Sequence, residues 1–295
     1  MQKLSEIAEL LAGRDGEPTA IAIVKAASHH VLDAVVPAVE NGWIYPILID
    51  SSEAINRALN DRIQPGKYEV IDCEDPAEAA QMGVQLVREG RASCLMKGIL
   101  PTGVFLKPVV NSETGIRASE LLSHVAVVEN ESIGRLVAIT DGGMVPAPTA
   151  QDLPALIEHG RLVMSKLGVQ SPKVSLLSAA ENVIRKLPSS VMQAEYVESA
   201  GDPNLAGPLS LDISLVPEIA KEKGYTGPIQ GDADILVAPD IVAGNALTKS
   251  LVLFGGGAMA GVICGASVPI VLTSRSASHD EKYYSIALAS VMGAK

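Results

Sequence analysis

Short apolar runs alternate with stretches of helical spacing through the first third of the chain. The runs predict strands and the spaced stretches predict helices, and a regular alternation of the two indicates parallel strands joined by helices. The predicted strands cover residues 20–24, 45–49, 68–72 and 93–96, and the predicted helices cover residues 29–40 and 76–89. We therefore expect an α/β fold that begins with a doubly wound sheet.

The pattern changes between Leu121 and Asp141. Two alternating apolar segments, residues 124–129 and 134–140, flank a polar turn and predict an antiparallel hairpin. After it we expect a helix over residues 152–167, a strand over residues 173–177 and a helix begun by a capping box of Ser178 and Glu181. A second α/β region therefore starts near residue 122. Because no low-complexity linker separates the two regions, they should pack closely and leave a cleft.

The longest uncharged stretch, residues 250–274, lies between Lys249 and Arg275. Its length alone would suffice for a membrane span. Glycines at five positions and Pro269 divide it, so a buried helix, a short strand and a second strand over residues 269–273 fit the pattern better. A final helix is predicted from about His279 to Met292.

The composition narrows the classes of function. The 295 residues are 47% hydrophobic and carry a net charge of -11, so this is a folded chain without a basic face for nucleic acid or an anionic membrane. An anionic ligand would have to be held by a few local cations. Three cysteines without histidine at ligand spacing argue against a metal site or a disulfide framework. The amphipathic start, which ends at Gly13, is no signal peptide, so we expect a cytoplasmic protein.

A cluster of polar residues follows the last predicted strand. Ser274, Arg275 and Ser278 lie just ahead of the final helix, and the carboxyl ends of strands and the N-termini of helices are both places where anions bind. This arrangement predicts a phosphate site. The alternative is that Ser278 only caps the helix while Asp280 and Glu281 offset its dipole.

Two further candidates lie in the second region. Gly244 and Asn245 should fall in the loop after the strand at residues 233–239, and Lys249 in the first turn of the next helix, where a lysine opposes the dipole unless an anion compensates. A solvated lysine is the alternative. Asp212 stands at a loop-to-helix start, where it could act on a ligand or serve as an N-cap. The five histidines show no pairing with serine or cysteine that predicts a catalytic triad.

Taken together, these segments resemble the phosphate acetyltransferase and phosphate butyryltransferase family. The ordered set spans roughly residues 93–295 and is far more specific than any one member. It consists of Lys97-Gly98, Leu106-Lys107-Pro108, Thr140-Asp141-Gly142-Gly143-Met144, residues 172–181, residues 207–212, residues 240–245 with Lys249, and Ser274-Arg275. Lys107-Pro108 stands where acetyl enzymes have an arginine before a proline, and Lys97-Gly98 with the segment Thr140–Met144 looks more like the butyryltransferase branch.

The resemblance implies an isopropylmalate-dehydrogenase-like fold of two α/β/α domains with the active site in an interdomain cleft. Residues 1–121 with 270–295 would form the first domain, and residues 122–269 an inserted second domain that makes a homodimer. The implied reaction is reversible transfer of a short-chain acyl group, butyryl favoured, between coenzyme A and inorganic phosphate. Coenzyme A would be a substrate, and no metal or redox cofactor would be needed.

The resemblance also implies roles for single residues. Ser274 would donate a hydrogen bond to the developing oxyanion, while Arg275 and Lys107 would bind the phosphoryl group. The base that deprotonates the thiol of coenzyme A would be Asp280 or Glu281. Further substrate contacts would come from Lys97, Asp212, Asn245 and Lys249.

Three other functions fit parts of the pattern. A phosphate acetyltransferase would share the chemistry and differ in the acyl pocket. A decarboxylating dehydrogenase would share the implied fold but needs clustered arginines that the second region lacks. A relative that binds coenzyme A without turnover would not need the two acids after Ser274.

Overall fold

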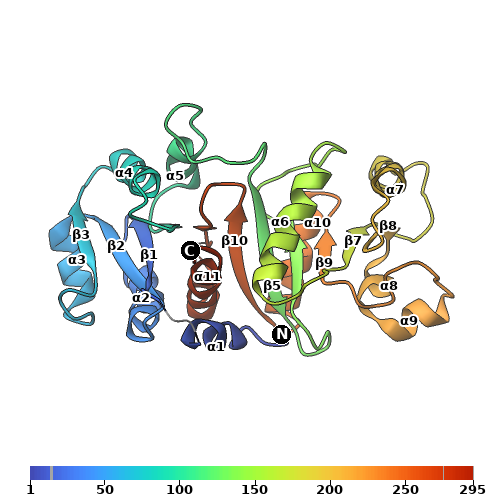
Figure 1. Cartoon of the computed structure of the whole chain (residues 1–295), viewed down its shortest axis with the longest axis horizontal. Coiled ribbons are helices and arrows are strands. Elements are labelled where there is room, and N and C mark those ends of the chain that lie inside the picture. Colours follow the sequence, from blue (N-terminus) through green and yellow to red (C-terminus); the bar gives the residue numbers. More distant parts are fainter. Residues whose placement is uncertain (14–15, 275, 295) are drawn as a thin grey trace. The chain divides into compact units, whose positions relative to one another are not determined.

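The computed structural model describes residues 1–13, 16–274 and 276–294 of the 295-residue chain (Figure 1). The chain forms two compact units. The terminal unit comprises Ser5–Leu122 with Ala260–Lys295, and the central unit comprises Met1–Leu4 with Ser123–Met259. The expected domain bounds at residues 121/122 and 269/270, and the cleft, stay predictions.

The terminal unit contains a mostly parallel sheet. Its strands are β1 (Thr19–Val24), β2 (Ile44–Asp50), β3 (Glu69–Asp72), β4 (Cys94–Lys97), β10 (Ala258–Cys264) and β11 (Ile270–Val271). Their order is β3-β2-β1-β4-β11-β10, and β10 alone runs antiparallel to its neighbour β11. The chain steps outward from β1 to β3 and then returns to the other side of β1 to form β4. Ligands of such sheets bind beyond the carboxyl ends of the strands at this reversal.

The helices of the terminal unit follow the signals in the sequence. They are α1 (Glu6–Ala12), α2 (His29–Glu40), α3 (Ser52–Leu59), α4 (Pro76–Arg88), α5 (Thr102–Val109) and α11 (His279–Met292). The bounds of α2 and α11 confirm the predicted ones. The carboxylate of Asp75 caps α4 by accepting hydrogen bonds from the N–H groups of Ala77 and Glu78, and Pro76 occupies the first turn, where a missing N–H costs nothing.

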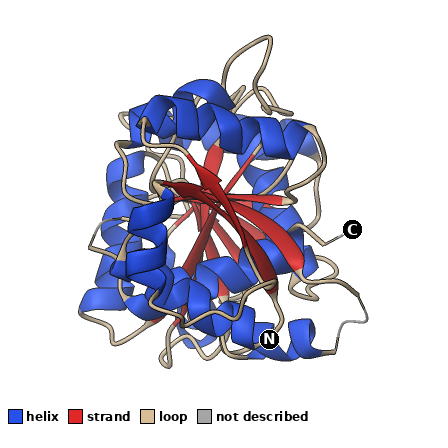
Figure 2. Ribbon diagram, turned by 90° about the vertical axis from the view of Figure 1, so that its left-hand side faces the viewer, coloured by secondary structure: helices blue, strands red, loops and turns tan. Residues whose placement is uncertain are grey.

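The central unit contains the predicted hairpin and a run of parallel strands. Its strands are β5 (Ser123–Glu129), β6 (Val137–Thr140), β7 (Val174–Leu177), β8 (Leu205–Leu209) and β9 (Ile235–Val237), in the order β5-β6-β9-β7-β8. Strands β5 and β6 pair antiparallel, which confirms the hairpin, and the other neighbours pair parallel. The carboxyl ends of β6, β9, β7 and β8 therefore meet at one edge. In Figure 2 the helices lie outside the strands of the sheets.

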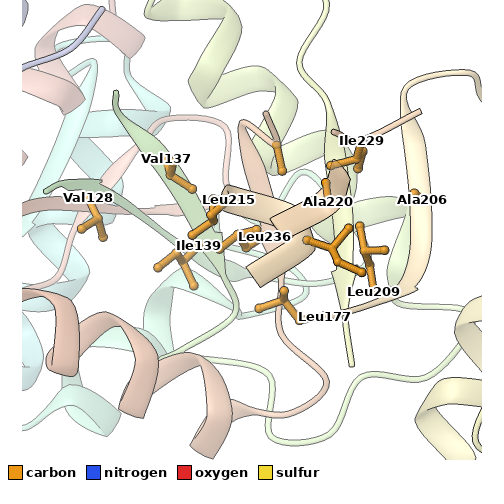
Figure 3. Close-up of a cluster of buried hydrophobic side chains, with 12 residues drawn as sticks. Val128, Val137, Ile139, Leu177, Ala206, Leu209, Leu215, Ala220, Ile229 and Leu236 are labelled. Atoms are coloured by element: carbon orange, nitrogen blue, oxygen red, sulfur yellow. The ribbon is translucent and has the colours of Figure 1, made fainter. Parts of the chain in front are cut away.

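A compact apolar core lies against the strands of the central unit (Figure 3). The helices of the central unit are α6 (Leu153–Lys166), α7 (Pro188–Ala200), α8 (Leu211–Leu215), α9 (Pro217–Glu222) and α10 (Ile241–Leu253). Side chains of β5 to β9 and of the short helices α8 and α9 pack together in this core. It consists of Val128, Val137, Ile139, Leu177, Ala206, Leu209, Ile213, Leu215, Ala220, Ile229, Ala233 and Leu236.

The helix expected at Ser178 and Glu181 is wrong. Residues 178–187 form no helix, and α7 begins at Pro188. The N–H of Ser178 instead donates to the carbonyl oxygen of Leu209 at 2.8 Å, which extends the pairing of β7 with β8. The capping-box pattern is present in the sequence, but the hydrogen bond to the neighbouring strand keeps the backbone extended.

The predicted position and burial of α10 are also wrong. Asp240 caps the helix through a hydrogen bond from the N–H of Ala243, so Gly244 and Asn245 lie within the helix and Lys249 lies beyond its first turn. The dipole conflict expected for Lys249 therefore does not arise. The helix is not buried either, because Leu253 is 67% exposed.

The uncharged stretch of residues 250–274 resolves into the end of α10, a glycine turn and strands β10 and β11. In the described part of the chain, no helix is both long and apolar enough to span a membrane.

Candidate active site

Lys97 lies at the carboxyl end of β4, next to the strand end that leads to Ser274. Val271 of β11 pairs with Met96 of β4, so Lys97 is level with the residue after Val271. The ammonium of Lys97 is buried, and its Nζ donates to the carbonyl oxygens of Gly98 and Leu100, both at 3.2 Å. The structure therefore holds a cation at the reversal point of the sheet.

Gly98 is required by its packing. A Cβ at this position would lie 2.0 Å from the carbonyl oxygen of Lys25 and 2.6 Å from that of Val24. The loop after β4 can therefore approach β1 this closely only with glycine.

An ion pair lies at the same edge of the sheet and was missed from the sequence. Lys25, directly after β1, forms an ion pair with Asp50 at the end of β2 and donates to the carbonyl oxygen of Glu74 at 3.1 Å. Lys25 has a φ of 58°, unusual for a residue with a side chain. The carboxylate of Asp50 also accepts a hydrogen bond from the N–H of Ala27 at 3.0 Å. The sequence signal is a lysine and an acid, each directly at a strand end.

The segment after β11 carries the predicted phosphate contacts. Ser274 is exposed, and its Oγ lies 3.0 Å from the Oγ of Ser276. Ser278 Oγ accepts a hydrogen bond from the N–H of Glu281 at 3.0 Å, which confirms its capping role. Arg275 lies outside the described residues, and the phosphate site stays a prediction.

The two candidate bases differ in their surroundings. Asp280 is exposed, and its Oδ1 lies 3.1 Å from the Nδ1 of His279, whose Nε2 lies 3.0 Å from the carbonyl oxygen of Asp33. The ring of His279 thus lies between the carboxylate of Asp280 and the backbone of α2. Glu281 is half-buried, one position further along α11. Because adjacent helix positions are about 100° apart, the two carboxylates point in different directions.

Lys282 follows these acids and was not expected in the site. It is buried, and its Nζ donates to the carbonyl oxygen of Ala277. Burial lowers the pKa of Lys282, while the neighbouring Glu281 opposes the change. The lysine thus secures the segment between β11 and α11.

Lys107 is exposed in the last turn of α5. Its neighbour Pro108 lines a pocket of about 510 Å³ beside α4. The other lining residues are Gln81, Val84, Gln85, Arg88, Glu89 and Thr114, so this pocket contains no predicted site residue.

The central unit orders the loop after β6 around Asp141, which is 1% exposed. The carboxylate of Asp141 accepts hydrogen bonds from the N–H groups of His124 at 2.7 Å, Gly143 at 2.5 Å and Met144 at 2.7 Å. Sequence reasoning included Asp141 in a motif without giving it a role. The three groups that donate to Asp141 are backbone N–H groups, so the side chains of the neighbouring residues could not predict these hydrogen bonds.

Asn245 fastens the same loop to α10. Its Nδ2 donates to the carbonyl oxygen of Gly142 at 3.0 Å. Gly244 is forced by this packing, since a Cβ there would lie 2.3 Å from the carbonyl oxygen of Asp141. Lys249 is exposed one turn beyond Asn245, so both side chains lie on one face of the helix.

Asp212 does not cap α8, because Ser210 occupies the N-cap position. The Oδ2 of Asp212 accepts a hydrogen bond from the Nζ of Lys223 at 2.8 Å. The pKa of Asp212 is lowered to about 2, chiefly by this hydrogen bond. The carboxylate is therefore ionised at neutral pH.

The structure also pairs a serine with a histidine, which the sequence analysis did not foresee. Ser123 Oγ lies 2.7 Å from the Nδ1 of His159. Both side chains are buried, and burial lowers the pKa of His159. A serine with no exposed surface is not accessible to a substrate, so the pair does not favour an acyl-enzyme.

Within the described residues, no group of three or more His, Cys, Asp and Glu side chains is placed to hold a metal ion.

Comparison with known proteins adds to this geometry. The model of the family described as phosphate acetyl/butaryl transferase matches residues 76–290. A phosphate butyryltransferase from Clostridium acetobutylicum is 35% identical over 92% of either chain, and a phosphate acetyltransferase from Thermotoga maritima is 35% identical over 99% of either chain. The crystal structure of a branched-chain phosphotransacylase from Enterococcus faecalis superposes with a TM-score of 0.85 at 38% identity, covering 94% of this chain and 99% of that one.

Proposed function

We propose that this chain, which belongs to the phosphate acetyl/butaryl transferase family, has butyryl-CoA as its preferred substrate. The reaction is the transfer of an acyl group between coenzyme A and inorganic phosphate, the activity named for its relatives. The match of the family model to residues 76–290 is the observation that supports acyl transfer between coenzyme A and phosphate. The butyryl preference is supported by Lys97-Gly98 together with the segment Thr140–Met144, and by Lys107-Pro108 in place of the arginine and proline of acetyl enzymes.

The thiol of coenzyme A needs a base in the direction that forms acyl-CoA. A free thiol has a pKa of about 8.5, so only a few per cent is thiolate at neutral pH. We propose that the base is Asp280 or Glu281, both in the first turn of α11. The thiolate then attacks the acyl phosphate, and phosphate leaves.

Cations and a hydroxyl would stabilise the charge that develops. Ser274 donates to the oxyanion, and Arg275 with Lys107 binds the phosphoryl oxygens. The exposure of Ser274 and Lys107 supports these roles. Lys97, whose Nζ is held by two carbonyl oxygens, contributes its positive potential from a fixed position.

Three residues of the central unit are proposed as further contacts for coenzyme A. Lys249 is exposed and offers a cation for a phosphate group, while Asn245, one turn earlier, holds the loop that Asp141 orders. Asp212, which is paired with Lys223, would contact the substrate through its carboxylate. In this scheme Asn245 contributes to the binding of coenzyme A through the loop after β6, which its hydrogen bond to Gly142 holds in place.

We further propose a cytoplasmic homodimer that consumes no metal or redox cofactor. The exposed apolar side chains of Val242, Leu253 and Phe254 on and beside α10 support a partner surface on the central unit. The cysteines, free and buried, fit a reducing compartment.

Phosphate acetyltransferase is the second candidate. The relative from Thermotoga maritima supports it, since it is as similar to this chain as the butyryl relative is. The two candidates differ only in the acyl pocket.

The test of the reaction is the formation of butyryl phosphate from butyryl-CoA and phosphate, trapped with hydroxylamine. We expect the acyl phosphate and free thiol to appear in equal amounts. Binding of coenzyme A by calorimetry without any acyl phosphate would instead support a non-catalytic relative. An absorbance change with NAD(P) and malate-type acids would support the dehydrogenase.

A further inference from the structure

The ion pair of Lys25 with Asp50 belongs to a residue with an unusual backbone. Lys25 has a φ of 58°, in the left-handed region that glycine adopts freely and other residues rarely adopt. The side chains of the pair are only 15% and 9% exposed. The carboxylate of Asp50 also accepts hydrogen bonds from the N–H groups of Ala27 at 3.0 Å and Ser51 at 2.9 Å. Because the carboxylate is fixed in this way, it can hold the lysine in one conformation.

The backbone of Lys25 joins the segments on both sides of β1. Its N–H donates to the carbonyl oxygen of Ile49 in β2 at 2.7 Å, and its carbonyl oxygen accepts from the N–H of Ile99, just after β4, at 2.9 Å. Rotation about φ moves the carbonyl group of Lys25 while its N–H can stay bonded to β2. The left-handed value of φ therefore decides whether the carbonyl oxygen reaches Ile99.

The segment that this carbonyl group holds also fixes the ammonium of Lys97. The Nζ of Lys97 donates to the carbonyl oxygens of Gly98 and Leu100, which lie on either side of Ile99. Gly98 packs so closely that a Cβ there would lie 2.0 Å from the carbonyl oxygen of Lys25. The hydrogen bond between Lys25 and Ile99 thus lies in the middle of the segment that places the Lys97 cation.

We propose that Lys25 is a positioning residue for Lys97. Its ion pair with Asp50 keeps residue 25 left-handed, so that its carbonyl oxygen holds residues 98–100 and, through them, the Lys97 cation at the reversal point of the sheet. This inference rests on the proposed function, because it takes Lys97 as a contributor to the active site. It requires the conformation of residue 25 rather than its charge, and glycine adopts that conformation without an ion pair.

The test compares K25A with K25G. Both variants lose the ion pair, and they differ by one methyl group, which disfavours the left-handed conformation only in K25A. We expect the amide of Ile99 to exchange its hydrogen about tenfold faster in K25A than in the native protein and at close to the native rate in K25G. With phosphate as the varied substrate, kcat/KM should fall about tenfold in K25A and recover in K25G.

The ion pair of Arg91 with Glu69 provides the matched control. Arg91 Nη2 donates to Glu69 Oε1 at 2.7 Å in the same unit. Glu69 is the first residue of β3, so this pair lies at the amino ends of the parallel strands, away from Lys97. R91A should therefore leave both the exchange of the Ile99 amide and kcat/KM at their native values.

Two results would overturn the inference. If K25A shows native exchange and native kcat/KM, backbone hydrogen bonds alone hold residue 25. If K25G loses as much as K25A, in folding or in rate, the charge itself is needed. A K25G variant that folds where K25A does not would support the inference. Failure of the proposed function is a separate result, in which the native protein forms no acyl phosphate, and the exchange of the Ile99 amide would still show whether Lys25 positions the segment.

Discussion

Replacement of Asp141 should destabilise the central unit strongly. The carboxylate is buried and accepts hydrogen bonds from three backbone N–H groups, those of His124, Gly143 and Met144. Hydrogen bonds to a charged group contribute about 1.5–3 kcal/mol each, and an unpaired buried donor costs free energy as well. Water can reach some of these N–H groups in a variant, so we expect D141A to lose about 4 kcal/mol of unfolding free energy.

The loss should also depend on the chemistry of the replacement. D141N keeps the shape and one accepting oxygen but not the charge, so we expect a smaller loss of about 2 kcal/mol. Urea unfolding at neutral pH, followed by circular dichroism, measures both values. D152A is the matched control, because Asp152 accepts from the N–H of Thr149 in an exposed turn. It should lose less than about 1 kcal/mol.

The activity of these variants tests the link to function. The loop that Asp141 orders is bound by Asn245, so kcat/KM for butyryl-CoA should fall in D141N even at temperatures where the variant is folded. The reasoning is refuted if D141A unfolds at the same urea concentration as D152A.

Three further predictions concern other contacts. The ion pair with Lys223 keeps the pKa of Asp212 at about 2, so the pair stabilises the fold above the ordinary aspartate pKa and this stabilisation is lost as pH falls toward 2. D212N should remove this part of the acid dependence of the unfolding free energy. Because both side chains are 39% exposed, D212N should change the unfolding free energy at neutral pH by less than about 1 kcal/mol. G98A should abolish folding of the terminal unit or lower its thermal midpoint sharply, because the new Cβ would lie 2.0 Å from the carbonyl oxygen of Lys25, and a native midpoint would contradict this packing. R275A should cost roughly 3 kcal/mol of transition-state stabilisation, about a hundredfold in kcat/KM, and near-normal turnover would remove Arg275 from the mechanism.

The α/β class and several element bounds could be predicted from the sequence because their signals are local. Helix α2, for example, has a clear apolar periodicity, and α4 carries its own cap at Asp75. The start of α10 could not be read in the same way. Gly244 and Asn245 are poor helix formers and suggested a loop, but the glycine is there because the backbone of Asp141 approaches so closely.

The candidate site residues came from the polar cluster after the last strand, from the segment after β9 and from the resemblance, and their roles stay predictions. The pairing of Lys25 with Asp50 joins the ends of two neighbouring strands, and a lysine and an acid at strand ends do not by themselves predict which charges will pair. The false helix at Ser178 has the same cause, because a hydrogen bond from a neighbouring strand outweighed a capping box. Tertiary contacts of this kind decide conformations that propensity alone leaves open.

The ratio of kcat/KM for butyryl-CoA to that for acetyl-CoA, with phosphate as acceptor, tests the central claim most directly. Each buried methylene contributes about 0.8 kcal/mol, so a pocket made for butyryl should favour it by about tenfold over acetyl and still turn acetyl-CoA over. Purified protein and detection of the released thiol are sufficient for the measurement. We predict a ratio well above one, and an acetyl preference of about tenfold would contradict the butyryl assignment while leaving acyl transfer to phosphate in place.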